Sequence, residues 1–216
     1  MTMQVDAVLA DGAPPIMAIL RGIRPAEAAS MAETLVAAGI RLIEVPFNSP
    51  EPLTSIRAMI AAVGDRAAIG GGTVLDPEAA DALADAGGTL LVSPNTNAAV
   101  IARGVARGLA AFPGFVTPSE AFAAVAAGAT RLKLFPASSY GPGYLKALKE
   151  VLPRDVRLWA VGGTDAATLG SWLDGGAEGI GVGGSLYRAG DDVATVAERA
   201  RALVSAWHEW RERRPN

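Results

Sequence analysis

The sequence lacks cysteine and contains a single histidine, which excludes several kinds of chemistry before any motif is considered. Disulfide bonds, thiolate nucleophiles and cysteine-ligated metals all require cysteine. His208 alone cannot build a multi-histidine metal site or a convincing Ser-His-Asp triad. Its place in the C-terminal amphipathic segment indicates a surface or packing role. We therefore expect no bound metal.

Long apolar runs and an excess of one charge are also missing. No apolar stretch approaches the roughly 20 residues that a membrane-spanning helix needs. The first residues carry Asp6 and no basic run, unlike a secretory signal. The net charge of −3, with both signs interspersed, gives no basic surface for nucleic acid or an anionic membrane. These features predict a cytoplasmic protein that binds neither nucleic acid nor a membrane.

Eight apolar, strand-like runs alternate with alanine-rich helical segments along the chain. Their spacing of roughly 20 to 27 residues is typical of βα units rather than of hairpins. Strands are expected at 15–21, 41–47, 67–71, 89–93, 108–113, 131–135, 156–161 and 178–183. Helices are expected at 26–38, 119–127 and 166–174 and from 191 to about 213. The pattern predicts an α/β fold: one (β/α)8 TIM-barrel domain over residues 1–216, with a short N-terminal segment before the first strand.

Lysine is scarce in this chain, and one of its three lysines lies in an unusual place. Lys133 is alone among apolar residues in Leu132-Lys133-Leu134-Phe135, which is typical of a buried strand. Burying an ammonium group is unfavourable unless it is paired or loses its proton. A lowered pKa would make the amine nucleophilic near neutral pH. The alternative is a lysine that snorkels from a strand end or pairs with a buried acid.

Glu44 is the acidic counterpart of Lys133, within the apolar strand Leu42-Ile43-Glu44-Val45-Pro46. In a barrel of this kind the strand ends that carry function meet on one face. A carboxyl group beside a nucleophilic lysine could move protons to and from a substrate. The alternative is that the two residues form only a buried ion pair.

Two further polar residues end strands on the same expected face. Arg21 ends the first strand, where its planar guanidinium could clamp a substrate carboxylate. Thr73 follows three glycines and could add a hydroxyl and a backbone N–H. Either residue could instead cap a neighbouring element.

Glycines end the last two expected strands. Gly162-Gly163 and Gly183-Gly184-Ser185 resemble the phosphate site that follows the last two strands of many barrels. Glycine lets backbone N–H groups approach an anion closely, although these glycines could serve tight turns only. Residues 179–184 also match the pattern G-x-G-x-x-G. No further strand with a ribose-binding acid follows, so a nicotinamide-dependent oxidoreductase is a distant alternative.

Five segments recur here in an order and spacing that point to a known family. They are Ile43-Glu44-Val45, Gly71-Gly72-Thr73-Val74, Ser93-Pro94-Asn95, Leu132-Lys133-Leu134-Phe135-Pro136 and Val161-Gly162-Gly163. Together they resemble the class I aldolases that cleave 2-keto-3-deoxy-6-phosphosugar acids, and the match spans nearly the whole chain. The resemblance implies a homotrimeric (β/α)8 barrel with a Schiff-base lysine at Lys133, a general acid/base at Glu44 and no cofactor.

The chain resembles the galactonate branch of that family more than the gluconate branch. Val161 stands where the gluconate branch has a threonine, and Asn48 stands where it has the arginine that holds the pyruvyl carboxylate. Arg21 is therefore expected to take over that role. One segment, Gly183-Gly184-Ser185, looks more like the gluconate branch.

The resemblance implies reversible cleavage of 2-dehydro-3-deoxy-6-phosphogalactonate to pyruvate and glyceraldehyde 3-phosphate. Lys133 and Glu44 are the expected catalytic residues. The expected substrate contacts are Arg21, Thr73, Val161, Gly162, Gly163, Gly183, Gly184 and Ser185. Two alternatives stay open. One is the gluconate epimer as substrate, alone or with the galactonate compound. The other is a non-enzymatic sugar-phosphate-binding barrel.

Overall fold

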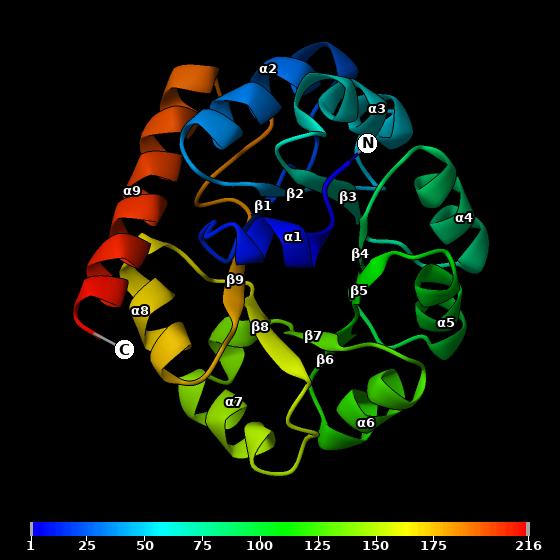
Figure 1. Ribbon diagram of the computed structural model, residues 1–216, viewed down its shortest axis with the longest axis vertical. Helices are drawn as coiled ribbons and strands as arrows, with labels where there is room; N and C mark the ends of the chain where they lie inside the picture. Colours follow the sequence, from blue (N-terminus) through cyan, green and yellow to red (C-terminus); the bar gives the residue numbers. More distant parts are fainter. Residues whose placement is uncertain (1, 215–216) are drawn as a thin grey trace.

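Within residues 2–214, which the computed structural model describes, nine parallel strands form one sheet that curls into a barrel (Figure 1). The strands are β1 (Ile16–Ile19), β2 (Leu42–Pro46), β3 (Ala68–Gly72), β4 (Leu90–Val92), β5 (Ala110–Phe112), β6 (Gly114–Phe115), β7 (Arg131–Leu134), β8 (Arg157–Val161) and β9 (Gly179–Val182). Their order is β5-β4-β3-β2-β1-β9-β8-β7-β6, so chain neighbours β5 and β6 stand at the two ends of the sheet. The predicted TIM-barrel fold is confirmed.

The barrel closes at Pro113, which divides the fifth expected strand. β5 pairs with β4, and β6 pairs with β7. Pro113 has no N–H to donate to the strand ladder, but its carbonyl accepts from the Lys133 N–H at 2.9 Å. The single strand expected at 108–113 is therefore two short strands, β5 and β6, that together take one strand position in the barrel. The proline interrupts the regular hydrogen bonding between them.

An outer ring of helices covers the sheet (Figure 1). It consists of α2 (Pro25–Ala37), α3 (Pro52–Val63), α4 (Pro77–Asp85), α5 (Ala98–Ala106), α6 (Pro118–Ala126), α7 (Pro142–Lys149), α8 (Ala166–Asp174) and α9 (Val193–Glu212), with a 3-10 turn η1 (Ala137–Ser139). Side chains of Asp76, Thr117 and Asp165 accept from backbone N–H groups in the first turns of α4, α6 and α8. No helix in the described range is long and apolar enough to cross a bilayer.

A short helix, α1 (Val5–Ala10), covers the N-terminal end of the barrel and crosses its centre in Figure 1. The sequence pointed only to a segment before the first strand, without a predicted structure. The buried side chains of α1 enter the apolar cluster inside the barrel, formed by Val5, Val8, Ala13, Met17, Leu42, Ala68, Leu90, Val92, Phe112 and Trp159. Asp6 on α1 also pairs with Arg131 on β7 at 2.6 Å. This end of the barrel is therefore closed.

Trp159 on β8 fills the middle of the barrel. Its ring meets Phe112 edge to face at 5.3 Å between centroids, and its indole N–H donates to Glu178 at 2.6 Å. Trp159 is the register partner of Lys133 on the neighbouring strand. The two residues are therefore side by side on neighbouring strands.

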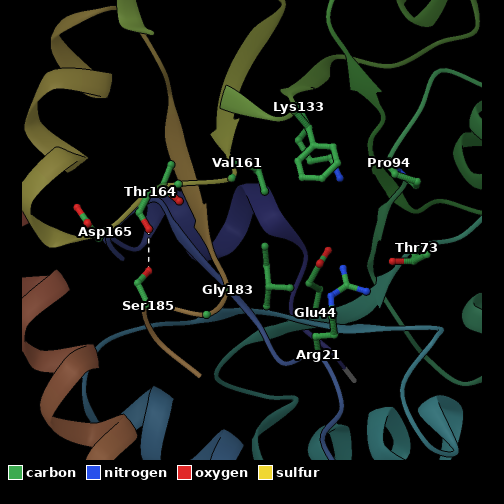
Figure 2. A pocket seen from close by; sticks show the side chains of 15 residues that line it. Arg21, Glu44, Thr73, Pro94, Lys133, Val161, Thr164, Asp165, Gly183 and Ser185 are labelled. Carbon is green, nitrogen blue, oxygen red and sulfur yellow. Dashed lines mark hydrogen bonds between the residues drawn. The ribbon is translucent and has the colours of Figure 1, made fainter. Parts of the chain in front are cut away.

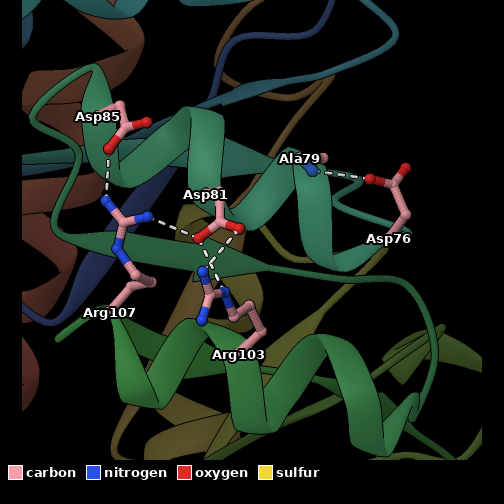
Figure 3. A network of polar contacts seen from close by, with 6 residues as sticks. All are labelled: Asp76, Ala79, Asp81, Asp85, Arg103 and Arg107. Carbon is pink, nitrogen blue, oxygen red and sulfur yellow. Dashed lines mark hydrogen bonds and ion pairs between the residues drawn. The ribbon is translucent and has the colours of Figure 1, made fainter.

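Ion pairs join helices on the outside of the barrel. Figure 3 shows Asp81 on α4 accepting from Arg103 on α5 and from Arg107 just after it, at 2.8 Å and 2.6 Å to the same carboxylate oxygen. Asp85 is also paired to Arg107. Solvent screens pairs at such exposed positions, so each contributes little to stability. They hold α4 against α5 but lie away from the strand ends.

Candidate active site

A cavity of about 420 Å³ lies at the C-terminal ends of the strands (Figure 2). All ten residues nominated from the sequence line it: Arg21, Glu44, Thr73, Lys133, Val161, Gly162, Gly163, Gly183, Gly184 and Ser185. Parallel strands that end on one face bring these residues together, although they are far apart in the chain. The cavity therefore holds an amine, a carboxyl group, a guanidinium and two glycine loops.

Lys133 enters the cavity from β7 and is only 7% exposed. Burial lowers the pKa of its amine to about 8; the nearby Glu44 opposes this change, and the Arg21 cation adds to it. The ring of Phe135 lies 4.8 Å from Nζ. Close to pH 8 about half of the amine is therefore neutral and can attack a carbonyl.

Glu44 enters the cavity from β2 and is 3% exposed. Burial raises the pKa of its carboxyl group to about 7, and the Lys133 and Arg21 cations oppose that rise. One carboxyl oxygen, Oε2, is buried without a hydrogen-bond partner among the described residues. Near neutral pH this group can both donate and accept a proton, which a general acid/base requires.

Gly72 makes room for the Glu44 carboxyl group. A Cβ atom at Gly72 would stand 2.5 Å and 2.8 Å from the two carboxyl oxygens of Glu44. Such distances are well inside van der Waals contact, so any side chain here would displace the carboxyl group. The glycine at the end of β3 thus positions an acid on β2.

Lys133 and Glu44 face the same space from opposite walls, as Figure 2 shows. Both lie in the described part of the chain, and their charged atoms form neither a hydrogen bond nor an ion pair with each other. The arrangement therefore leaves a gap between amine and carboxyl group. A substrate carbon and its oxygen can occupy that gap.

Arg21, two residues after β1, lies beside Glu44 in Figure 2. Its Nη1 donates to Oδ1 of Asn48 at 2.6 Å, and the next residue, Gly22, donates from its N–H to Oγ of Ser49 at 2.9 Å. The loop after β2 thus holds the loop after β1 at two points. The guanidinium keeps further N–H donors for an anion.

Thr73 follows β3 with a φ of +55°. A β-branched residue rarely adopts this left-handed conformation, and such backbone strain concentrates at functional sites. The N–H of the next residue, Val74, donates to Val92 O at 3.2 Å, which anchors the loop to β4. The strained turn aims the Thr73 hydroxyl at the cavity, on the same wall as Arg21 (Figure 2).

The glycine loops after β8 and β9 form the other end of the cavity. Gly162 and Gly163 have φ values of +96° and +75°, which favour glycine. A Cβ added to Gly184 would meet no atom within 4 Å, so the loop surface is open there. Among residues 2–214, the N–H groups of Gly163, Gly184 and Ser185 donate to no acceptor. Such backbone N–H groups bind anions well.

Hydrogen bonds tie the two glycine loops together. The Ser185 hydroxyl donates to Thr164 O at 2.7 Å, as Figure 2 marks, and the Thr164 hydroxyl donates to Gly181 O at 2.6 Å. Ser185, expected as a substrate contact, therefore uses its hydroxyl proton for the protein. Its backbone N–H remains available for a ligand.

Five lining residues were not nominated from the sequence: Ile19, Pro94, Phe135, Thr164 and Asp165. Pro94 and Phe135 belong to the family segments, and Thr164 follows the Gly162-Gly163 pair, so position next to a motif was the available signal. Asp165 caps α8 by accepting from Thr168 N at 2.9 Å, which occupies its carboxylate. Ile19 is one of several apolar strand residues, and nothing in the sequence distinguishes it.

The described residues contain no group of three or more His, Cys, Asp or Glu side chains that could hold a metal ion. His208 lies on α9 with its ring 4.7 Å from that of Trp207, and it does not line the cavity. It is exposed, in agreement with the surface or packing role predicted for it. The groups in the cavity are suited to amine and carboxyl chemistry.

Comparison with known proteins agrees with this chemistry. The chain matches the family profile for KDPG and KHG aldolase over residues 5–198. It is 49% identical over 195 residues to the 2-dehydro-3-deoxy-6-phosphogalactonate aldolase of Escherichia coli K12, covering 90% of this chain and 95% of that protein. It is 33% identical over 162 residues to the 2-dehydro-3-deoxy-phosphogluconate aldolase of Zymomonas mobilis, covering 74% and 76%. A solved structure of native KDPGal matches with a TM-score of 0.91 and 46% identity, over 98% of this chain and 100% of that one.

Proposed function

This chain belongs to the KDPG and KHG aldolase family, and from that premise we propose that it is a class I aldolase acting on 2-dehydro-3-deoxy-6-phosphogalactonate. The reaction is the reversible cleavage of that compound to pyruvate and glyceraldehyde 3-phosphate. The observation that carries the mechanism is that a buried amine and a buried carboxyl group face each other across one cavity. Their pKa values of about 8 and about 7 leave both groups able to exchange protons near neutral pH.

The first step is formation of an imine. The neutral amine of Lys133 attacks the C2 carbonyl carbon, and the carbonyl oxygen becomes the hydroxyl of a carbinolamine. The Glu44 carboxyl group donates its proton to that hydroxyl, which leaves as water. The product is a protonated imine on Lys133 and a carboxylate at Glu44.

The second step breaks the C3–C4 bond. The Glu44 carboxylate, directly or through a water, removes the proton of the C4 hydroxyl, and that carbon becomes the aldehyde carbon of glyceraldehyde 3-phosphate. The bonding electrons move to the protonated imine, which becomes an enamine. Glu44 then returns the proton to C3, and hydrolysis releases pyruvate and restores the lysine. The imine accepts the electrons, so no metal is needed.

Opposite ends of the cavity suit the two anionic ends of the substrate. Arg21 and Thr73, beside Glu44, can hold the carboxylate that becomes part of pyruvate. The free N–H groups of Gly163, Gly184 and Ser185 can hold the phosphate. A substrate held at both ends has its C2 carbon between Lys133 and Glu44, where the chemistry requires it.

The second candidate function is cleavage of the C4 epimer, 2-dehydro-3-deoxy-6-phosphogluconate. The segment Gly183-Gly184-Ser185 favours it, because it resembles the corresponding loop of the gluconate branch. Val161, which lines the cavity, favours the galactonate compound, because a threonine hydroxyl is missing there. Comparing kcat/KM for the two epimers decides between them. We also propose a homotrimer, as expected from the family, which light scattering of the purified protein tests.

The mechanism is tested by trapping the imine with borohydride and pyruvate, followed by peptide mass spectrometry. We expect the adduct on Lys133, and Lys133→Met should form none. Glu44→Gln should still be trapped but lose roughly 10²–10⁴-fold in turnover. An adduct found only on Lys146 or Lys149 would exclude this mechanism. Absence of any adduct in an active enzyme would exclude class I chemistry. A protein that binds the sugar phosphate without cleaving it would be a binding barrel.

A further inference from the structure

The loop after β9 presents two peptide groups at the anion-binding end of the cavity. In a planar trans peptide the C=O and the N–H point in opposite directions. A hydrogen bond that fixes the direction of a carbonyl therefore also fixes the direction of the N–H in the same peptide. The Gly183 carbonyl accepts from the N–H groups of Leu186 and Tyr187, at 2.8 Å and 2.9 Å. These two bonds hold the peptide whose N–H belongs to Gly184.

The next peptide is held differently. The carbonyl of Gly184 accepts from Nε of Arg188 at 3.1 Å, and no backbone donor reaches it within the described residues. The N–H of this same peptide belongs to Ser185. Gly184 has no side chain, and no atom would lie within 4 Å of a Cβ there, so packing does not restrain the peptide. Among the described residues, Arg188 therefore donates the hydrogen bond that holds this carbonyl, while the Ser185 hydroxyl, bonded to Thr164 O, anchors the next residue.

Arg188 is itself well anchored. Its backbone N–H donates to the Asp191 carboxylate at 2.9 Å, and that carboxylate also pairs with Arg199 on α9. The side chain is exposed, and its two terminal nitrogens make no hydrogen bond or ion pair with residues 2–214. Arg188 does not line the cavity. Any effect of Arg188 on a ligand in the cavity therefore passes through the Gly184–Ser185 peptide that it contacts.

We propose that Arg188 is a positioning residue for phosphate recognition, because its Nε holds the Gly184–Ser185 peptide with the Ser185 N–H turned toward the cavity. The hydrogen bond also polarises that peptide and strengthens its N–H as a donor. The inference rests on the proposed function, which places the substrate phosphate at this loop. It assigns to Arg188 an effect on phosphorylated ligands and none on imine formation at Lys133.

Two substitutions separate this role from a direct charge effect. In Arg188→Gln the amide nitrogen stands the same number of bonds from Cα as Nε does in arginine, so a neutral donor is retained. Arg188→Met has a similar length but neither donor nor charge. Arg154→Met removes an exposed arginine that does not line the cavity and serves as the control. Thermal unfolding of each variant checks that the fold is intact.

Binding of glycerol 3-phosphate, an inert phosphate monoester, is measured by calorimetry for each variant. We expect affinity to fall roughly 10-fold in Arg188→Met and to stay within about threefold of wild type in Arg188→Gln and Arg154→Met. In the cleavage assay, KM for the phosphorylated substrate should rise in Arg188→Met with kcat little changed. Trapping with pyruvate should be unaffected.

Three outcomes would overturn the proposal. Equal losses in the Gln and Met variants would mean that the charge of Arg188 matters and its hydrogen bond does not. Unchanged binding in Arg188→Met would mean that the peptide is held without Arg188. A loss of pyruvate trapping that matches the loss of phosphate binding would indicate general damage to the site. If the wild type binds glycerol 3-phosphate as expected but cleaves neither epimer, the proposed function fails while the role of Arg188 stands.

Discussion

Replacing Lys133 with methionine should abolish activity and at the same time stabilise the protein. The ordinary lysine pKa of 10.5 falls to about 8 in the folded protein, chiefly because the amine is buried. One pKa unit corresponds to about 1.4 kcal/mol, so the folded state is destabilised by about 3 kcal/mol wherever the lysine is protonated in both states. Methionine has a similar length and no charge to bury. The free energy of unfolding of Lys133→Met should therefore exceed that of wild type by about 2–3 kcal/mol at low pH.

The sign of the pH dependence follows from the lowered pKa. Below pH 8 both the folded and the unfolded protein carry the charged lysine, and the full penalty applies. As the pH rises from 8 toward 10.5, the folded state loses its proton first, and the penalty disappears. The advantage of Lys133→Met should therefore be greatest below pH 8 and shrink above it. A measurement near pH 6 is the cleanest, because Glu44, with a pKa of about 7, is then mostly protonated and has little attraction to the lysine charge that the substitution removes.

The assay is urea unfolding of wild type and Lys133→Met at several pH values, at one protomer concentration so that any oligomerisation contributes equally. Lys146→Met, at an exposed position on α7, is the matched control and should change stability by less than about 0.5 kcal/mol. If Lys133→Met is no more stable than wild type near pH 6 while the control is unchanged, burial of the Lys133 ammonium group does not destabilise the folded protein. The account of its lowered pKa would then be wrong.

The remaining predictions concern activity. Arg21→Gln removes a cation that lowers the pKa of both Lys133 and Glu44, so both limbs of the kcat/KM profile should move to higher pH, and unmoved limbs would exclude this coupling. Gly72→Ala should lose at least roughly 10-fold in turnover while pyruvate trapping persists, because the new Cβ collides with the Glu44 carboxyl group; normal turnover would show that the acid can move. Val161→Thr should shift the kcat/KM ratio toward the gluconate epimer by an amount worth about 1 kcal/mol, and an unchanged ratio would remove Val161 from specificity. Activity should survive EDTA, since metal ligands are scarce; loss restored by a divalent ion would indicate metal-dependent chemistry.

Much of the fold could be predicted because the eight βα units are regular. Apolar runs bounded by glycine, proline and acidic caps locate strands and helices closely, as for α9, expected over 191–213 and found at Val193–Glu212. Two features were missed for physical reasons. The division at Pro113 depends on the hydrogen bond from the Lys133 N–H to the Pro113 carbonyl, which helps to close the barrel. Helix α1 is stabilised by packing its two buried valines into the barrel interior. Neither is a local property of the chain.

The sequence by itself identified the residues that are unusual for their surroundings: a lysine and a glutamate within apolar strands, and glycines at strand ends. Those anomalies are chemical, because an ionisable group in an apolar strand is unfavourable wherever the strand lies. Only the tertiary structure decided how these groups are arranged. It separates the amine from the carboxyl group across a cavity, uses Gly72 to make room for the carboxyl group, and turns the Ser185 hydroxyl toward the protein. These arrangements depend on barrel closure and strand register, which bring together residues separated by many positions in the chain.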